Sequence, residues 1–162
     1  MPRKALIFGG SGLVGQALLQ ALIAAPDFDA IASFGRRDLP DLPTKVRQHR
    51  VDFSRLSAQA ALLQGEVVFC CLGTTMKAAG SRAAFRRVDY DYPLEVGRMA
   101  RAAGIDQFIL VSAIGADPRS LFFYSRVKGE LERDLLALDF PQLAFLQPSL
   151  LLGERQEKRL TE

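Results

Sequence analysis

The chain has little of what metal sites, disulfides and membrane spans require. It contains one histidine, His49, and two cysteines, Cys70 and Cys71. The cysteines are neighbours on a predicted buried strand, where successive side chains point to opposite faces, so we expect two structural thiols and no disulfide. His49 lies in the polar stretch 47–50 without a metal-binding partner, so we expect it to be exposed and predict no metal site.

Long apolar runs and blocks of charge are also missing. No run of about 18 apolar residues occurs, and residues 1–5 lead directly into the first predicted strand, so we expect no membrane span, no signal peptide and a cytoplasmic location. The formal charge of +3 comes from arginines spread along the chain. This pattern indicates neither nucleic acid nor a membrane as a partner, and an anionic small ligand would account for part of the charge.

The hydrophobic residues follow an alternating strand and helix pattern. The 162 residues are 49% hydrophobic, which suits one domain, residues 1–162, with a single core. Apolar strands separated by helices predict an α/β fold of the Rossmann type, a doubly wound parallel sheet with helices on both faces. We predict strands at 4–8, 30–34, 46–51, 67–72, 108–111 and 143–147, and helices at 13–25, 56–63, 83–103 and 121–138.

A glycine-rich segment, GGSGLVG at 9–15, lies between the first predicted strand and helix. Glycines allow a tight turn and a close approach to a pyrophosphate, and the helix N-terminus offers unpaired N–H groups. No Lys-Ser/Thr pair follows, which disfavours a P-loop, and a plain turn is the alternative. The residues predicted to bind a dinucleotide here are Gly9, Gly10, Ser11, Gly12, Leu13, Val14 and Gly15.

Two arginines, Arg36 and Arg37, follow the second predicted strand. An NAD site usually has an acidic residue at this spacing, to bind the ribose 2'-hydroxyl. Guanidinium groups bind a 2'-phosphate instead, so we expect NADP(H) to be preferred over NAD(H). A solvated surface pair is the alternative, and Asp38 stands directly after the arginines.

The segment YSRVK places Tyr124 and Lys128 four residues apart, on one face of a predicted helix. A nearby ammonium stabilises a phenolate, which makes Tyr124 a candidate general acid and base. Ser112 ends the fifth predicted strand, where its hydroxyl could bind a substrate carbonyl, because sites in such sheets lie beyond the carboxyl ends of the strands. A coincidental surface pair is the alternative for the tyrosine and the lysine.

The glycine turn, the serine and YxxxK together resemble the short-chain dehydrogenase/reductase superfamily over essentially the whole chain. The strings FGRR, CCLGTT, FRRVDYDYP, VSAIGAD, YSRVKGELE and QPSLLLGERQE resemble its atypical Tat-interacting-protein-like branch. The resemblance implies that Ser112, Tyr124 and Lys128 are catalytic and that Lys128 also holds the nicotinamide ribose. It further implies cofactor contacts by Arg36, Arg37, Asp52, Leu72, Gly73, Thr74, Tyr124, Lys128 and Pro148.

The chain also departs from that pattern. It has no asparagine, so the relay asparagine of the classical enzymes is missing. Asp89 lies near the corresponding position, where it either serves a proton relay through water or has a structural role. Relatives usually continue for tens of residues beyond this point, so we expect a C-terminal extension to be lacking or not shown, with 154–162 as a charged, frayed end.

The sequence supports two main functional hypotheses. The first is an NADP(H)-dependent oxidoreductase that acts on an unknown carbonyl or alcohol substrate, with Tyr124 moving the proton. The second is an NADP(H)-binding redox sensor or protein-interaction scaffold without turnover. Thiol catalysis by Cys70 or Cys71 is disfavoured, because no base is placed beside them.

We expect a small-molecule substrate and a homodimer, and leave open a protein partner. Phe122 and Phe123 are expected to pack in the core, or else to cover a substrate.

Overall fold

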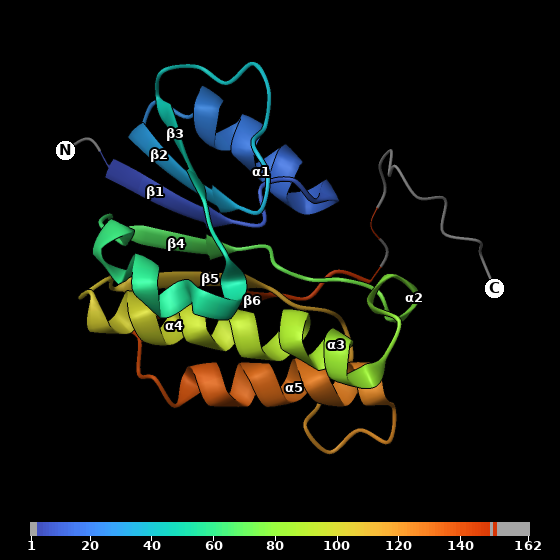
Figure 1. The fold of residues 1–162 in the computed structure, drawn as a ribbon. Helices are drawn as coiled ribbons and strands as arrows, with labels where there is room; N and C mark the ends of the chain where they lie inside the picture. Colours follow the sequence, from blue (N-terminus) through green and yellow to red (C-terminus); the bar gives the residue numbers. More distant parts are fainter. Residues whose placement is uncertain (1–2, 150, 152–162) are drawn as a thin grey trace.

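Six strands form one parallel sheet in the computed structural model, which describes residues 3–149 and 151 (Figure 1). Their order across the sheet is β3-β2-β1-β4-β5-β6. The order reverses direction between β1 and β4, and ligands of such sheets bind in the crevice beyond the carboxyl ends of the strands at that point. The predicted Rossmann-type fold is confirmed. The strands are β1 (Arg3–Phe8), β2 (Phe28–Gly35), β3 (Val46–Arg50), β4 (Val67–Cys70), β5 (Gln107–Val111) and β6 (Gln142–Leu146).

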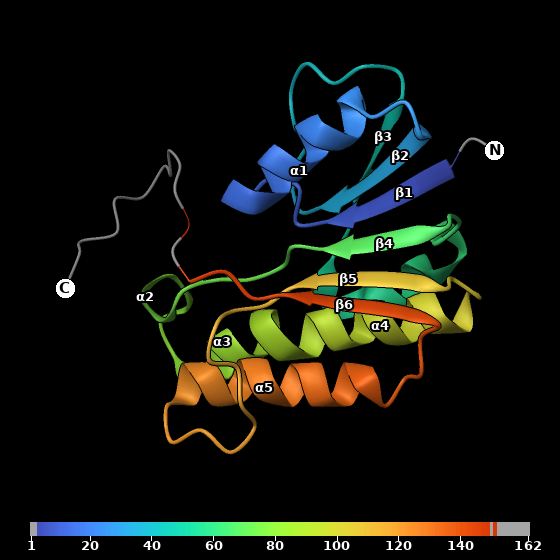
Figure 2. The ribbon, with the colours of Figure 1, turned by 180° about the vertical axis from the view of Figure 1, so that it is seen from behind.

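Alternate residues of β1 enter two separate cores. Leu6 and Phe8 pack in a cluster with residues of α4 (Tyr92–Ala102) and α5 (Phe123–Leu136). Ala5 and Ile7 point to the other face and pack with residues of α1 (Leu13–Ala24). Both faces of the sheet therefore carry helices, as predicted, and Figure 2 shows α1 separated by the sheet from α4 and α5.

The edge strand β6 is only partly covered by the described part of the chain. In β6, alternate residues are exposed, and Leu146 retains 54% of its accessible surface.

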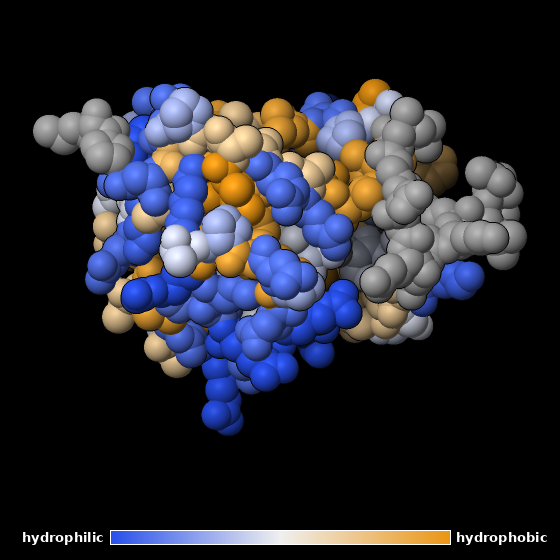
Figure 3. Space-filling view, turned by 90° about the horizontal axis from the view of Figure 1, so that it is seen from above, coloured by the Kyte–Doolittle hydropathy of each residue, from blue (hydrophilic) through white to orange (hydrophobic). Residues whose placement is uncertain are grey.

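The face around α1 and the loop after β2 mixes hydrophilic and apolar atoms, without one large block of either kind (Figure 3). No helix among residues 3–149 is long and apolar enough to cross a membrane.

The long predicted helix at 83–103 is interrupted in the structure. A short helix α3 (Arg82–Arg86) continues through a π-helical turn, η2 (Arg87–Asp91), into α4. Single π-turns inside helices occur often at functional sites. Here the turn carries Asp89, which is fully buried, toward α5.

Two other helical segments differ from the prediction. The predicted α-helix at 56–63 is a 3-10 helix, η1 (Phe53–Leu62), because the Asp52 side chain accepts the backbone N–H of Ser54 and starts the helix early. A helix not predicted, α2 (Met76–Ala79), follows β4 and is capped by the Thr75 side chain. The predicted C-terminal end at 154–162 lies outside the described residues, as does most of QPSLLLGERQE.

Candidate active site

The glycine-rich turn after β1 has the close packing that a dinucleotide cradle needs. A Cβ atom at Gly15 would lie 1.9 Å from the carbonyl oxygen of Gly9. Gly9 itself has φ of +85° and lies so near β4 that a Cβ atom would come within 2.8 Å of the Cys71 carbonyl. The turn is thus closed by backbone contacts, and both positions require glycine.

The start of α1 has open space for an anionic group and offers it hydrogen-bond donors. A Cβ atom at Gly12 would meet nothing nearer than 3.7 Å, and no side chain caps the helix. The first N–H groups of a helix have no partner within it, and the helix dipole favours an anion there. The segment that runs through Ser11, Leu13 and Val14 therefore fits a pyrophosphate.

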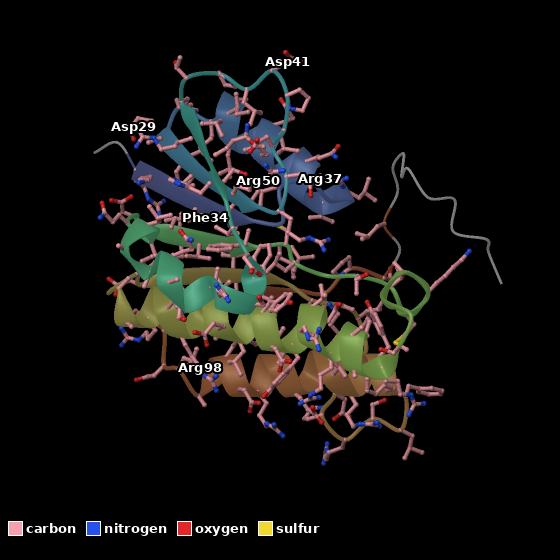
Figure 4. All side chains as sticks on the ribbon, in the orientation of Figure 1. Asp29, Phe34, Arg37, Asp41, Arg50 and Arg98 are labelled. Atoms are coloured by element: carbon pink, nitrogen blue, oxygen red, sulfur yellow. The ribbon has the colours of Figure 1, made fainter. Side chains whose placement is uncertain are left out.

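Arg36 and Arg37 are exposed on the loop that leaves β2. Neither guanidinium makes a hydrogen bond or ion pair with the residues that the structure describes, although the Arg36 carbonyl accepts from Arg50 Nε at 3.2 Å. Figure 4 shows Arg37 at the end of β2, far from Arg98 on α4. Both guanidinium groups can therefore turn toward a ligand, and their preference for a 2'-phosphate stays a prediction.

Asp52 and the loop at 72–74 were predicted to line the adenine and ribose side. Asp52 is exposed, and its Oδ1 accepts the backbone N–H of Ser54 at 2.9 Å and the hydroxyl at 2.6 Å. These bonds lower the pKa of the Asp52 carboxyl. Leu72, Gly73 and Thr74 follow β4, whose end packs against Gly9. The loop thus lies beside the glycine turn, as a cofactor wall would.

Ser112 and Tyr124 line one hollow of ≈ 400 Å³ at the carboxyl ends of β4, β5 and β6. Ser112 is buried, and its Oγ has no hydrogen-bond partner among the described residues. A buried hydroxyl without a partner is costly and rare, so this atom is suited to bind a ligand oxygen. The hollow is lined by Thr75, Met76, Ser112, Ala113, Ile114, Tyr124, Pro148, Ser149 and Leu151.

Tyr124 and Lys128 lie on the first turns of α5. Lys128 Nζ lies 5.8 Å from the centre of the Tyr124 ring. The ring also packs against Phe85, with 5.5 Å between centroids, which fixes its direction while 39% of the residue stays exposed. The predicted neighbourhood of the phenol and the ammonium is therefore present.

A buried ion pair joins Lys128 to Asp89. Asp89 Oδ1 lies 2.6 Å from Lys128 Nζ, which makes the two an ion pair. Asp89 Oδ2 accepts the backbone N–H of Thr74 at 2.8 Å. Burial raises the pKa of the Asp89 carboxyl, and the ammonium and the N–H oppose that shift. Asp89 thus connects the 72–74 loop with the helix that carries Tyr124.

Other predictions about single side chains had mixed outcomes. His49 was expected to be exposed, but it is half-buried because its ring stacks on Phe34 at 4.9 Å, and burial lowers its pKa. Phe122 was expected in the core, but it is 79% exposed because it precedes the first turn of α5. Both cysteines are free thiols, as predicted, and burial raises the pKa of each to about 12.

Sequence reasoning missed several residues of the site. Phe85 supports the Tyr124 ring, although nothing in its sequence context distinguishes it from an ordinary core residue. Ala113 and Ile114 line the hollow, and their position directly after Ser112 was the available signal. Among the described residues, no group of three His, Cys, Asp or Glu side chains could hold a metal ion.

Comparison with known proteins identifies the family of the chain. Residues 5–120 match the model of the NAD dependent epimerase/dehydratase family. Among curated relatives, Protein HTATIP2 of Rattus norvegicus is 40% identical over 97% of this chain and 66% of its own length. Protein FMP52-1, mitochondrial, of Scheffersomyces stipitis is 37% identical over 96% and 70%. The chain thus spans about two thirds of the length of these relatives.

Solved structures share the fold at lower identity. The oxidoreductase ylbE from Lactococcus lactis has a TM-score of 0.77 and 21% identity, over 94% of this chain and 71% of its own. MoeE5, solved with UDP-glucuronic acid and NAD, has a TM-score of 0.76 and 21% identity, over 89% and 54%. The chain therefore belongs to the NAD dependent epimerase/dehydratase family of NAD(P)-binding proteins, and it is a homologue of HTATIP2 and FMP52.

Proposed function

We propose that the chain is an NADP(H)-dependent oxidoreductase of the short-chain dehydrogenase/reductase type, acting on a carbonyl or alcohol. One observation carries this proposal: Ser112, whose buried hydroxyl has no partner among the described residues, lines the same hollow as Tyr124. The Ser112 hydroxyl can therefore bind a substrate oxygen. The Tyr124 phenol, which can exchange a proton, lines the same hollow. Lys128, buried one helical turn further along α5, completes the set.

Each side chain has a distinct part in the proposed reaction. The nicotinamide cofactor, when bound, supplies the hydride to the carbonyl carbon or accepts it from the alcohol. The Ser112 hydroxyl donates a hydrogen bond to the substrate oxygen and so orients the carbonyl. Tyr124 gives its phenolic proton to that oxygen as the alcohol forms, and takes one back in the reverse direction. The Lys128 ammonium would hold the nicotinamide ribose when the cofactor is bound.

The choice of NADP(H) over NAD(H) rests on Arg36 and Arg37. Both follow β2 directly, and the structure describes no acceptor for either guanidinium. Charge-assisted hydrogen bonds from arginine to a phosphate are among the strong ones, and NAD(H) lacks the 2'-phosphate that would accept them. A titration with the two cofactors tests this choice.

Replacing Tyr124 with phenylalanine tests the proposed chemistry. We expect turnover of a carbonyl substrate with NADPH to fall about 100-fold or more, while the affinity for NADPH stays within about twofold. Tyr92→Phe is the matched control. Tyr92 lies on α4, stacks on Phe53 and does not line the hollow. Full turnover in Tyr124→Phe would contradict the assignment of the proton to this phenol.

A redox-sensing or scaffold function is the second candidate. Leu121 and Phe122, 95% and 79% exposed, immediately precede the catalytic helix α5, and exposed apolar side chains of this size suit a protein partner or a second copy of the chain. Such a protein would bind NADPH without turnover in the wild type. A homodimer and a cytoplasmic location remain part of the proposal, to be measured by sedimentation and cell fractionation, since FMP52-1 is named mitochondrial.

A further inference from the structure

The wall of the hollow beside Ser112 carries no formal charge among the residues described. Its apolar part comes from α2 and from the segments that follow β5 and β6, and includes Met76, Ile114 and Leu151. Ile114 keeps 62% of its surface exposed and Met76 keeps 37%. Covering exposed apolar side chains with an apolar ligand removes them from water and so favours binding.

Four side chains with hydroxyl groups line the hollow: Thr75, Ser112, Tyr124 and Ser149. Thr75 Oγ1 already accepts the Ala78 N–H at 3.0 Å as the cap of α2. The Ser112 hydroxyl has no partner, and the Tyr124 phenol lines the same hollow. These two hydroxyls suit a single ligand oxygen, which is what a carbonyl or alcohol presents.

The buried cation near the hollow is already neutralised. Lys128 Nζ lies 2.6 Å from Asp89 Oδ1, and both side chains are buried. A carboxylate or phosphate on the substrate would lose hydration in this hollow without gaining an unpaired positive charge from the residues described. An anionic substrate is therefore disfavoured on the substrate side, whereas the cofactor side has Arg36 and Arg37 for its phosphate.

We infer that the substrate is an uncharged aldehyde, ketone or alcohol with one reacting oxygen and an apolar part that lies against Met76 and Ile114. This inference rests on the proposed function, since it assigns the hollow beside Ser112 to the substrate. Met76 and Ile114 then determine specificity by contacting the apolar part of the molecule. Burying each methylene group contributes about a threefold to fourfold gain in affinity.

The test measures binding, so that it does not depend on turnover. Calorimetric titration of the 162-residue chain with saturating NADPH, which cannot oxidise an alcohol, compares 1-octanol with 8-hydroxyoctanoate, which differ by a carboxylate at the far end. We expect at least tenfold tighter binding of 1-octanol. Ile114→Arg should place a guanidinium at the hollow and tighten the binding of 8-hydroxyoctanoate at least fivefold.

Leu136→Arg is the matched control, because Leu136 is 61% exposed on α5 but does not line the hollow. It should leave both affinities unchanged. Equal or tighter binding of 8-hydroxyoctanoate by the unmodified chain, binding of neither ligand, or equal effects of the two arginine variants would overturn the inference. If 1-octanol is preferred but octanal is not reduced by NADPH, the ligand class stands and the oxidoreductase proposal fails.

Discussion

Asp89 and Lys128 form a buried ion pair, with 2.6 Å between Oδ1 and Nζ, at the point where η2, α5 and the 72–74 loop meet. The other oxygen of Asp89 holds the Thr74 N–H. A Cβ atom at Gly73 would lie 3.3 Å from Asp89 Oδ1, so the loop backbone packs directly on the pair. The position of the Lys128 ammonium is thus tied to a loop predicted to contact the cofactor.

Removing the Asp89 carboxylate should destabilise the protein strongly. Asp89→Ala leaves the Lys128 ammonium buried without its anion and the Thr74 N–H without its acceptor, and loss of one partner from a buried pair typically costs about 3–5 kcal/mol. Asp89→Asn should cost less, because its amide oxygen can still accept the Thr74 N–H. The free energy of unfolding, measured with urea, gives both values.

Glu130→Gln provides the matched control for this prediction. Glu130 Oε2 lies 2.5 Å from Arg86 Nη1, so this pair also links α3 to α5, but the side chains are 20% and 39% exposed. A partly exposed pair contributes less than about 1 kcal/mol. An equal loss of stability in Glu130→Gln and Asp89→Ala would show that burial of the Asp89 pair has no special energetic role.

Much of the fold was predictable because it follows from local patterns. The apolar runs that became β1, β4 and β5 are buried on the sheet, and Gly9 and Gly15 stand where only glycine fits. The pairing of Tyr124 with Lys128 followed from helical spacing alone. These features depend on residues close together in sequence, which periodicity and glycine spacing report well.

Other features depend on contacts between distant residues. The π-turn that carries Asp89 inward does not alter the apolar spacing enough to be seen, so one long helix was predicted. Asp89 and Lys128 are 39 positions apart, and they meet because η2 packs against α5. His49 was placed in solvent because its sequence neighbours are polar, whereas Phe34, on the adjacent strand, covers its ring.

Replacing Arg36 and Arg37 together with alanine should reduce cofactor preference. The affinity for NADPH should fall about tenfold or more, because hydrogen bonds to the 2'-phosphate are lost, while the affinity for NADH should change less than about threefold. Nicotinamide fluorescence titration measures both. Arg98→Ala is the control, since Arg98 lies on α4 across the molecule (Figure 4). Equal losses for NADPH and NADH would contradict the assignment.

Two glycines of the turn should respond differently to alanine. Gly15→Ala forces a Cβ atom against the Gly9 carbonyl oxygen, so we expect a loss of stability of about 1–3 kcal/mol or more. Gly12 has open space around it and a φ of −77°, which alanine can adopt. The melting temperature of the Gly12→Ala variant should therefore change little. Its methyl group would nevertheless occupy the space predicted for the pyrophosphate and weaken dinucleotide binding. Undiminished NADPH affinity in Gly12→Ala would contradict that placement.

The two cysteines should be almost inert in the folded protein. Burial raises the pKa of both thiols from 9.0 to about 12, which reduces the thiolate fraction at pH 8 about a thousandfold. Reaction with Ellman's reagent should therefore be slow in the native chain, and both thiols should react within minutes in guanidinium chloride. A native thiol that reacted as fast as the unfolded ones would restore Cys70 or Cys71 as a candidate nucleophile. Slow reaction of both leaves the chemistry to Ser112 and Tyr124, because a thiol that cannot ionise near neutral pH cannot act as the attacking group.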